Sequence, residues 1–285
     1  MRRNSKSSEG IPAQPPASQA VSVAPLRFAS PAPGSGIAEV AVEAPVSIVY
    51  GNQPYAVMMA TPSDLEDFVT GFSLTEGIVR IAAEIRGIAV SPQPDGIVVT
   101  VDLEPGRFRE HLARRRNLSG RTSCGLCGVE TLSDMPRASR GANAETALTP
   151  AAIRNALGEI ERHQPLNRLT RSVHAAAWCD LDGRILAARE DVGRHNALDK
   201  LIGARLRVGH NAKDGFVLVT SRASFEMVEK AAIFGAGALV AISAPTSLAI
   251  ERARALGLAL VCVAREDGAV LFAGEWQRES ESAAR

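Results

Sequence analysis

Two cysteines separated by two residues form the segment of this sequence best suited to covalent chemistry. Cys124 and Cys127 lie in a run from Arg121 to Gly128, and a glycine follows each thiol. Glycine lets the backbone turn without steric penalty, so both sulfur atoms can be presented to a partner. Arginines upstream favour the thiolate, which is the reactive form of cysteine. The pattern predicts a reactive thiol pair rather than a packing feature.

A CxxC pair also occurs in zinc sites and in thioredoxin-like motifs. A structural zinc ion usually takes four ligands in two pairs. The other two cysteines, Cys179 and Cys262, are isolated and fall in predicted strands, where they would pack as small apolar side chains. A thioredoxin motif belongs to an early strand–helix unit, whereas this pair lies in a segment rich in serine and glycine. Sulfur transfer is therefore favoured, and no metal site is expected.

A second group of polar residues stands beside predicted strands and helices. Ser221 and Arg222 follow a buried strand, and Arg194 and His195 precede a helical pattern. Ligands of α/β sheets usually bind at the carboxyl ends of strands, and N–H groups at a helix start bind anions. These four residues are candidates for an anion site, and a structural role for His195 fits the pattern equally well.

The elements that must position these residues alternate in the second half of the chain. Apolar strands separated by helices favour parallel pairing and an α/β sandwich. The predicted strands cover 174–178, 185–188, 216–219, 238–242 and 258–263, and the helical patterns cover 196–206, 225–234 and 247–256.

The first half predicts a smaller α+β domain. Hairpins are expected around residues 51–52 and 94–96. Between them, Thr61 and Pro62 fit the N-cap and first position of a helix. The apolar face of that helix consists of Leu65, Phe68, Val69 and Phe72.

Composition divides the chain and excludes several classes of protein. A net charge of +1 argues against a general nucleic-acid binder, and no apolar run is long enough to span a membrane. Four cysteines are too few for a disulfide scaffold, which favours the cytoplasm.

The expected segments are a disordered tail at 1–35, the α+β domain at 36–105, a basic segment with a flexible CxxC loop at 106–145, the α/β domain at 146–276 and a tail at 277–285.

Several motifs together resemble the FdhD family of formate dehydrogenase accessory sulfurtransferases. The resemblance covers about residues 38 to 272, and the order of the motifs around the CxxC pair makes coincidence improbable. The matching segments are Glu43–Val46, Asp67–Gly77, Cys124–Gly128, His174–Ala177, Glu190–Lys200, Ser221–Ser224 and Ser243–Ala249.

The resemblance implies a sulfur carrier. A cysteine desulfurase would load a persulfide on Cys124, and the sulfur would pass to the molybdenum of a bis(molybdopterin guanine dinucleotide) cofactor destined for formate dehydrogenase. Cys127 would either release the sulfur by forming a disulfide or stabilise the persulfide. The family also implies a dimer and a cytidine-deaminase-like carboxy-terminal domain. Its cofactor segment would fall on Val263, Ala264, Arg265, Glu266, Asp267 and Gly268.

Two other functions compete with this one. A zinc deaminase needs H-x-E followed by P-C-x-x-C, but no histidine here has Glu two places later, and Ser123 precedes Cys124. That class is rejected. The alternative that stays open is a non-catalytic chaperone, which would bind the guanylated cofactor without using the thiols.

Overall fold

The computed structural model describes residues 13–23, 36–116, 148–210, 212, 214–265 and 267–275. Cys124, Cys127 and Glu266 lie outside these residues, as do most of the expected CxxC segment and the tail at 277–285.

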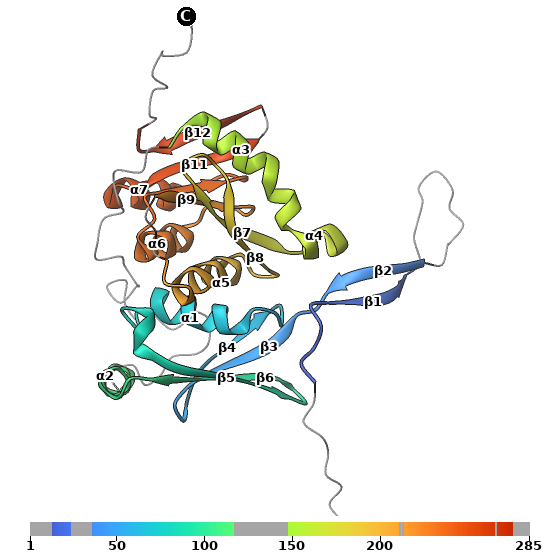
Figure 1. Ribbon diagram of the computed structural model, residues 1–285, viewed down its shortest axis with the longest axis vertical. Helices are drawn as coiled ribbons and strands as arrows, with labels where there is room; N and C mark the ends of the chain where they lie inside the picture. Colours follow the sequence, from blue (N-terminus) through green and yellow to red (C-terminus); the bar gives the residue numbers. More distant parts are fainter. Residues whose placement is uncertain are drawn as a thin grey trace, which may run out of the picture.

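The larger sheet has six strands and belongs to the second half of the chain (Figure 1). Its strand order is β12-β11-β10-β9-β7-β8. Strands β9, β10 and β11 pair in parallel as expected, but β7 runs antiparallel to β8 and β9, and β12 runs antiparallel to β11, so the sheet is mixed. The strands are β7 (His174–Asp180), β8 (Ile185–Asp191), β9 (Gly215–Val219), β10 (Ala238–Ala241), β11 (Ala259–Arg265) and β12 (Gly268–Ala273).

Helices cover both faces of this sheet. Apolar side chains of α5 (Arg194–Arg207), α6 (Phe225–Phe234) and α7 (Ser247–Leu256) pack on one face. Those of α3 (Pro150–Ile160) pack on the other. The short helices η3 (Glu161–His163) and α4 (Pro165–Thr170) follow α3. No helix among the described residues is long and apolar enough to cross a membrane.

The smaller sheet has four strands in the order β4-β3-β6-β5. Both predicted hairpins are confirmed: β3 (Ala44–Tyr50) pairs with β4 (Gln53–Ala60), and β5 (Ile85–Gln93) pairs with β6 (Gly96–Leu103). Helix α1 (Leu65–Thr75) and the short η1 (Ala82–Glu84) lie between the hairpins in sequence, and α2 (Pro105–Arg116) follows the sheet. The expected apolar face of α1 is buried.

Helix α1 does not begin where the sequence predicts. Its N-cap is Asp64, in the left-handed region at φ 53°, rather than Thr61. Thr61 is fully buried, and its Oγ1 accepts a hydrogen bond from the Val192 N–H instead of capping the helix. The N-cap prediction was wrong because a distant segment uses the threonine oxygen.

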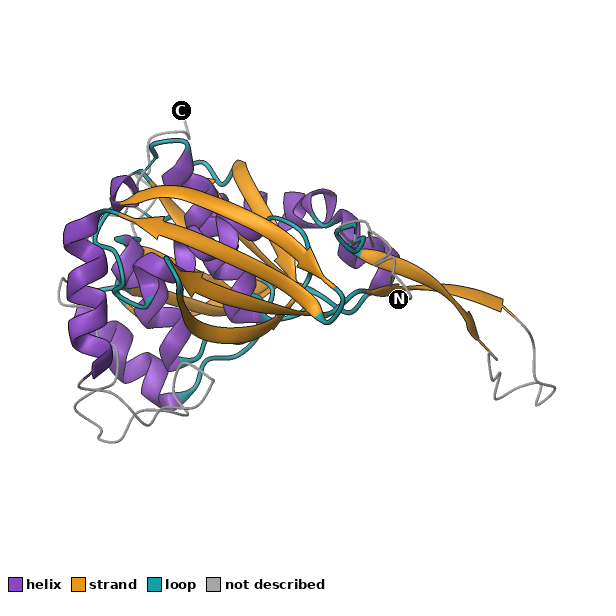
Figure 2. Ribbon diagram, turned by 90° about the horizontal axis from the view of Figure 1, so that it is seen from below, coloured by secondary structure: helices purple, strands orange, loops and turns teal. Residues whose placement is uncertain are grey.

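A two-stranded ribbon projects from the body of the molecule (Figure 2). It pairs β1 (Ser18–Val23) with β2 (Gly36–Ala41) in antiparallel register. The expected disordered tail at 1–35 is therefore wrong for β1. The backbone groups of β1 pair with β2, which lies beyond the predicted end of the tail.

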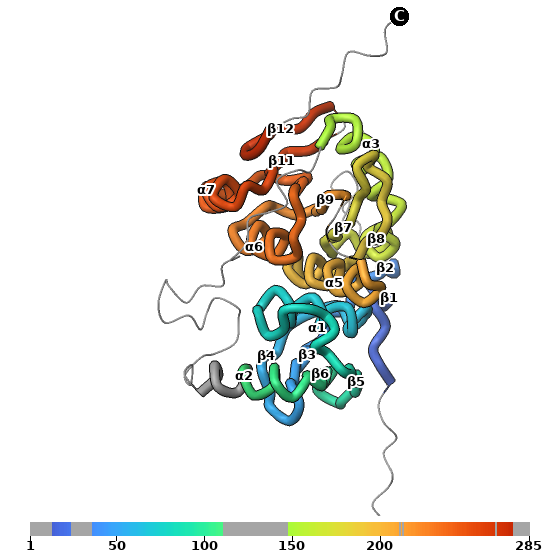
Figure 3. The backbone as a smooth tube through the Cα atoms, turned by 60° about the vertical axis from the view of Figure 1, so that its left-hand side comes forward, coloured from blue at the N-terminus to red at the C-terminus, as the bar shows by residue number. Residues whose placement is uncertain are grey.

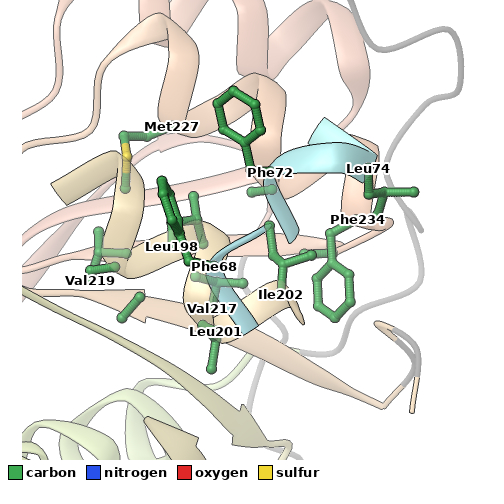
Figure 4. Packing of buried hydrophobic residues seen from close by; sticks show 14 of the residues in the cluster. Phe68, Phe72, Leu74, Leu198, Leu201, Ile202, Val217, Val219, Met227 and Phe234 are labelled. Carbon is green, nitrogen blue, oxygen red and sulfur yellow. The ribbon is translucent and has the colours of Figure 1, made fainter. Parts of the chain in front are cut away.

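Helix α1 lies between the smaller sheet and helix α5 (Figure 3). A Cβ on Gly71 would stand 1.9 Å from the Asp199 carbonyl oxygen, and one on Gly203 would stand 1.8 Å from that of Asp67. The two helices thus cross with their backbones in contact. One apolar cluster runs from the smaller sheet through α1 to the larger sheet, and Figure 4 shows Phe68 and Phe72 within it. The division into two domains stays a prediction.

Candidate anion-binding site

One edge of the larger sheet collects the predicted binding residues. Strand β8 runs parallel to β9, because both are antiparallel to β7. The carboxyl ends of β8, β9, β10 and β11 therefore share one edge with the start of β7. Helices α5 and α6 begin at this edge, directly after β8 and β9. The topology thus brings Ser221, Arg222, Arg194 and His195 to one side of the sheet.

The groups that shift the pKa of His174 show that these side chains lie close together. Burial is the main cause that lowers the pKa of His174, which opens β7 opposite Asp191. The charges of Arg194, His195 and Arg222 lower the pKa further, in that order, and Asp191 opposes them. Since each of these groups acts on one imidazole, Arg194 and Arg222 lie at one edge with His174. The carboxylates of Asp191 and Glu226 lie nearby. An anion would relieve the repulsion among the cationic groups.

His195 is oriented by a carboxylate from a neighbouring helix. Its Nε2 stands 2.7 Å from Glu226 Oε2, and both side chains are about a third exposed. The close approach of His195 is the main cause that lowers the pKa of Glu226. Glu226 sits in the first turn of α6, where a negative charge is favourable. The pair fixes the imidazole at this edge of the sheet.

Several buried polar atoms at this edge have no hydrogen-bond partner in the described part of the chain. Gly193, the N-cap of α5, has no side chain, and the side chain of Ser224, the N-cap of α6, accepts no hydrogen bond from its helix. Five buried atoms among the described residues lack a hydrogen-bond partner, and three of them lie at this edge: Arg194 Nε, His195 Nε2 and Ser224 Oγ. Buried polar atoms are rarely left unpaired in native proteins. Their presence beside two helix starts is the pattern of a site that receives an anionic ligand.

The predicted cofactor segment divides at the end of β11. Val263 donates its N–H to the Ser243 carbonyl oxygen at 3.1 Å, so it lies on the same edge as Arg222, two strand spacings or about 10 Å away. Val263 adopts φ 53°, a strained conformation for a β-branched residue. The side chain of Ala264 is fully buried in the second core cluster, so only its backbone could meet a ligand.

The remaining described part of that segment forms the β11–β12 hairpin. Arg265 pairs with Gly268 beyond a bulge in the register. Arg265, Asp267 and Gly268 are exposed. The structure therefore groups Ser221, Arg222, Arg194 and His195 at one edge of the sheet. Arg265, Asp267 and Gly268 follow Val263 in the β11–β12 hairpin.

The two described cysteines are unsuited to chemistry at sulfur. Cys179 and Cys262 are fully buried, and burial raises the pKa of both thiols, that of Cys262 to about 12. They pack in the apolar clusters, as the sequence predicts. Cys124 and Cys127 lie outside the described residues.

Sequence reasoning missed two carboxylates that organise the site. Glu226 pairs with His195, and Asp191 accepts hydrogen bonds from the Thr61 and Gly193 N–H groups. The available signal for Glu226 was its place in the first turn of a helix that follows a strand end. Asp191 gave no comparable signal, because its partners come from both halves of the chain.

The fold and the site define a mixed α/β protein with arginine and histidine side chains at the carboxyl edge of its larger sheet and a CxxC pair in the segment between its two sheets. The chain belongs to the FdhD/NarQ family, whose profile matches residues 41–278.

Relatives and a solved structure share this assignment. A protein of Bordetella petrii named "Sulfur carrier protein FdhD" is 46% identical over 233 residues, which cover 82% of this chain and 84% of that protein. A protein of Xanthomonas euvesicatoria with the same name is 47% identical and covers 82% and 83%. The crystal structure of a putative formate dehydrogenase accessory protein from Desulfotalea psychrophila superposes with a TM-score of 0.70 at 26% identity, covering 91% of this chain and 98% of that one.

Proposed function

We propose that this protein is a sulfur carrier for the maturation of formate dehydrogenase. It takes a sulfur atom from a cysteine desulfurase as a persulfide on Cys124. It then passes the sulfur to the molybdenum of a bis(molybdopterin guanine dinucleotide) cofactor, which is its substrate. The name of the Bordetella relative and the description of the Desulfotalea structure support this function.

The state of the cysteines is the observation on which the proposal depends. Sulfur exchange needs an accessible thiolate. Of the four cysteines in the sequence, Cys179 and Cys262 are buried and their pKa values are raised. This leaves Cys124 and Cys127 as the proposed carriers.

The loading step is a thiol–persulfide exchange. The Cys124 thiolate attacks the terminal sulfur of the desulfurase persulfide, a new S–S bond forms, and the desulfurase cysteine leaves as a thiolate. No external oxidant or reductant is needed, because the sulfur keeps its oxidation state. Cys127 then either stabilises the persulfide or attacks Cys124 Sγ. In the second case the persulfide S–S bond breaks, the outer sulfur leaves as hydrosulfide, and the Cys124–Cys127 disulfide must be reduced by a cellular thiol before the next cycle.

The carboxyl edge of the larger sheet would hold the cofactor by its phosphate groups. Guanidinium groups bind phosphate by paired, charge-assisted hydrogen bonds, which suits Arg194 and Arg222. Ser221 and His195 complete the proposed phosphate contacts, and the segment from Val263 to Gly268 is the proposed contact for the rest of the nucleotide. The two arginines beside His174 and the unpartnered Arg194 Nε support this assignment.

Further parts of the proposal come from the family resemblance. The carboxy-terminal domain would be similar to the cytidine deaminase fold, and the flexible CxxC loop would join it to the first domain. The protein would act in the cytoplasm as a homodimer, without nucleic acid, a membrane or a structural metal.

Mass spectrometry after incubation with a cysteine desulfurase and cysteine tests the carrier function. The wild-type protein should gain one sulfur atom on the peptide that contains Cys124, and Cys124→Ala should not. Cys262→Ala is the matched control, because its thiol is buried in the core, and it should be loaded like the wild type.

Activation of formate dehydrogenase separates the carrier from its alternative. Cys124→Ala should abolish activation while it leaves binding of guanosine diphosphate intact. Full activation by this variant would contradict sulfur transfer and would identify the protein as a chaperone that only binds the cofactor.

A further inference from the structure

A buried polar contact links the smaller sheet to the corner of the chain that carries Arg194 and His195. We propose that Thr61, which directly follows β4, is a positioning residue for the anion-binding site. The inference rests on the proposed function, because it assumes that this site receives the phosphates of a guanine nucleotide.

Asp191 is the centre of this contact. Its Oδ1 accepts hydrogen bonds from the Gly193 N–H at 2.7 Å and from Asn196 Nδ2 at 3.0 Å. Its Oδ2 accepts one from the Thr61 N–H at 3.0 Å and lies 2.6 Å from Lys200 Nζ. Both ends of the Asp191–Lys200 ion pair are 0% exposed. Four donors therefore fix the Asp191 carboxylate.

Thr61 uses each of its polar groups to hold the same corner. Besides its N–H, its carbonyl oxygen accepts from Lys200 Nζ at 2.9 Å, and its Oγ1 accepts from the Val192 N–H at 3.1 Å. Asn196 Nδ2 adds a bond to the Met59 carbonyl oxygen at 2.8 Å. We call Thr61, Asp191, Val192, Asn196 and Lys200 the Thr61 corner.

The position of the Thr61 corner determines what it does. Val192 and Gly193 are the two residues before Arg194 and His195, so these bonds set where helix α5 starts. The turn is tight, since a Cβ on Gly193 would stand 2.8 Å from Asn196 Nδ2. A buried ion pair is often no more stable than apolar packing of the same volume. The Thr61 corner therefore serves to hold Arg194 and His195 in the positions that the anion site needs.

A second buried threonine provides a comparison within the same molecule. Thr75 Oγ1 donates to Asp199 Oδ1 at 2.8 Å and accepts from Lys230 Nζ at 2.8 Å. It too joins α1 to the second half of the chain and is buried. Thr75 Oγ1 bonds to Phe72, Asp199 and Lys230 rather than to residues 191–195, so Thr75 serves as the matched control.

Loss of the Thr61 hydroxyl should weaken anion binding without removing a group that touches the anion. In Thr61→Val the shape is kept, but the Val192 N–H loses its acceptor. The segment before Arg194 then becomes less ordered, and the ligand must bear the cost of ordering it. An unmade buried hydrogen bond of this kind corresponds to about a tenfold loss in affinity.

Calorimetric titration with guanosine diphosphate tests the proposal on the full-length protein. Thr61→Val should bind about tenfold more weakly than the wild type, and Thr61→Ser, which keeps the hydroxyl, should bind like the wild type. Thr75→Val should lower the thermal midpoint but leave the affinity unchanged. Equal affinity of Thr61→Val and the wild type, or an equal loss in Thr75→Val, would overturn the positioning role.

Hydrogen exchange gives a second measurement that does not depend on the variant folding. Since coupling is reciprocal, the bound nucleotide should slow exchange of the wild-type Thr61 and Val192 amides. Unchanged exchange at both amides with nucleotide bound would contradict the proposal. If the wild-type protein does not bind guanosine diphosphate at all, the proposed anion site itself is wrong, and the inference falls with it. That outcome differs from normal binding by the wild type with no effect of Thr61→Val, which would contradict only the positioning role.

Discussion

Single residues determine the charge of the proposed site. Arg194, His195 and Arg222 all act on His174, whose pKa burial already lowers. A bound phosphate would oppose the same cations and raise the pKa of His174. The residue is therefore placed to take up a proton when an anion arrives.

The affinity for guanosine diphosphate should increase as pH falls below the ordinary histidine value of 6.5. The pKa of His174 is higher with the anion bound than in the free protein, so binding takes up a proton. The affinity therefore increases as pH falls between the bound-state and the free-state pKa. His174→Gln should reduce the slope of affinity against pH, measured by calorimetry. His163→Gln is the control, because His163 is exposed outside the site. The same slope in all three proteins would contradict a titration of His174, since the ligand's own titration is common to them.

The stability of the free protein should show the opposite dependence on the same group. Because the pKa of His174 is lowered in the folded state, its contribution is complete above 6.5 and is lost as pH falls through the folded value.

Among the elements, the pair of helices α1 and α5 joins the two sheets. The crossing depends on the missing side chains of Gly71 and Gly203, which let each backbone contact the other. Ion pairs flank it: Arg207 pairs with Asp67 at 2.6 Å, and Lys230 pairs with Asp199 at 2.9 Å. Burial alone would lower the pKa of Lys230, but the charges of Asp199 and Glu76 hold it above its ordinary value.

Gly203→Ala should destabilise the protein by about 3 kcal/mol or more, because the new Cβ meets a backbone oxygen that cannot rotate away. Gly158→Ala is the control: it lies in α3 with nothing within 4 Å of its Cβ position. That change should stabilise by about 0.5–1 kcal/mol, since alanine is the better helix former. Urea unfolding of both variants measures the difference. A loss of under about 1 kcal/mol for Gly203→Ala would contradict the close crossing.

The sequence predicted most elements but only part of the site. Local signals sufficed for the two hairpins, for the apolar face of α1 and for Ser221 and Arg222 after a buried strand. Thr61 failed as an N-cap because its partners lie 130 residues away in sequence. Asp191 escaped because one of its partners, Thr61, is also distant in sequence. Glu226 lies in the first turn of a helix, but this local signal does not identify His195 as its partner.

At the scale of the whole molecule, one continuous core unites the two sheets. Its buried side chains include Ile48 in the smaller sheet and Trp178 in the larger one. Because the cluster is not divided at α1, neither sheet retains its packing when the other is lost. The two halves should therefore unfold together.

Ile48→Val should lower the midpoint of unfolding observed through Trp178 by about 2–4 °C, for a loss of about 1 kcal/mol. Trp276→Phe in both proteins makes Trp178 the sole tryptophan, and its fluorescence reports on the larger sheet. The signal from Tyr50 and Tyr55 reports on the smaller sheet. Separate midpoints for the two probes, or an unshifted Trp178 midpoint, would show two independent units.

The anchors of the thiol-bearing segment have a kinetic consequence. Helix α2 ends beside the smaller sheet, and α3 begins on the far face of the larger one (Figure 1). Cys124 is thus tethered at both ends to the body that would hold its acceptor. Delivery to a cofactor bound on the same chain would be unimolecular, with an effective concentration in the millimolar range or above for a short tether. Its rate would then be independent of dilution, whereas loading by the desulfurase would slow in proportion to it.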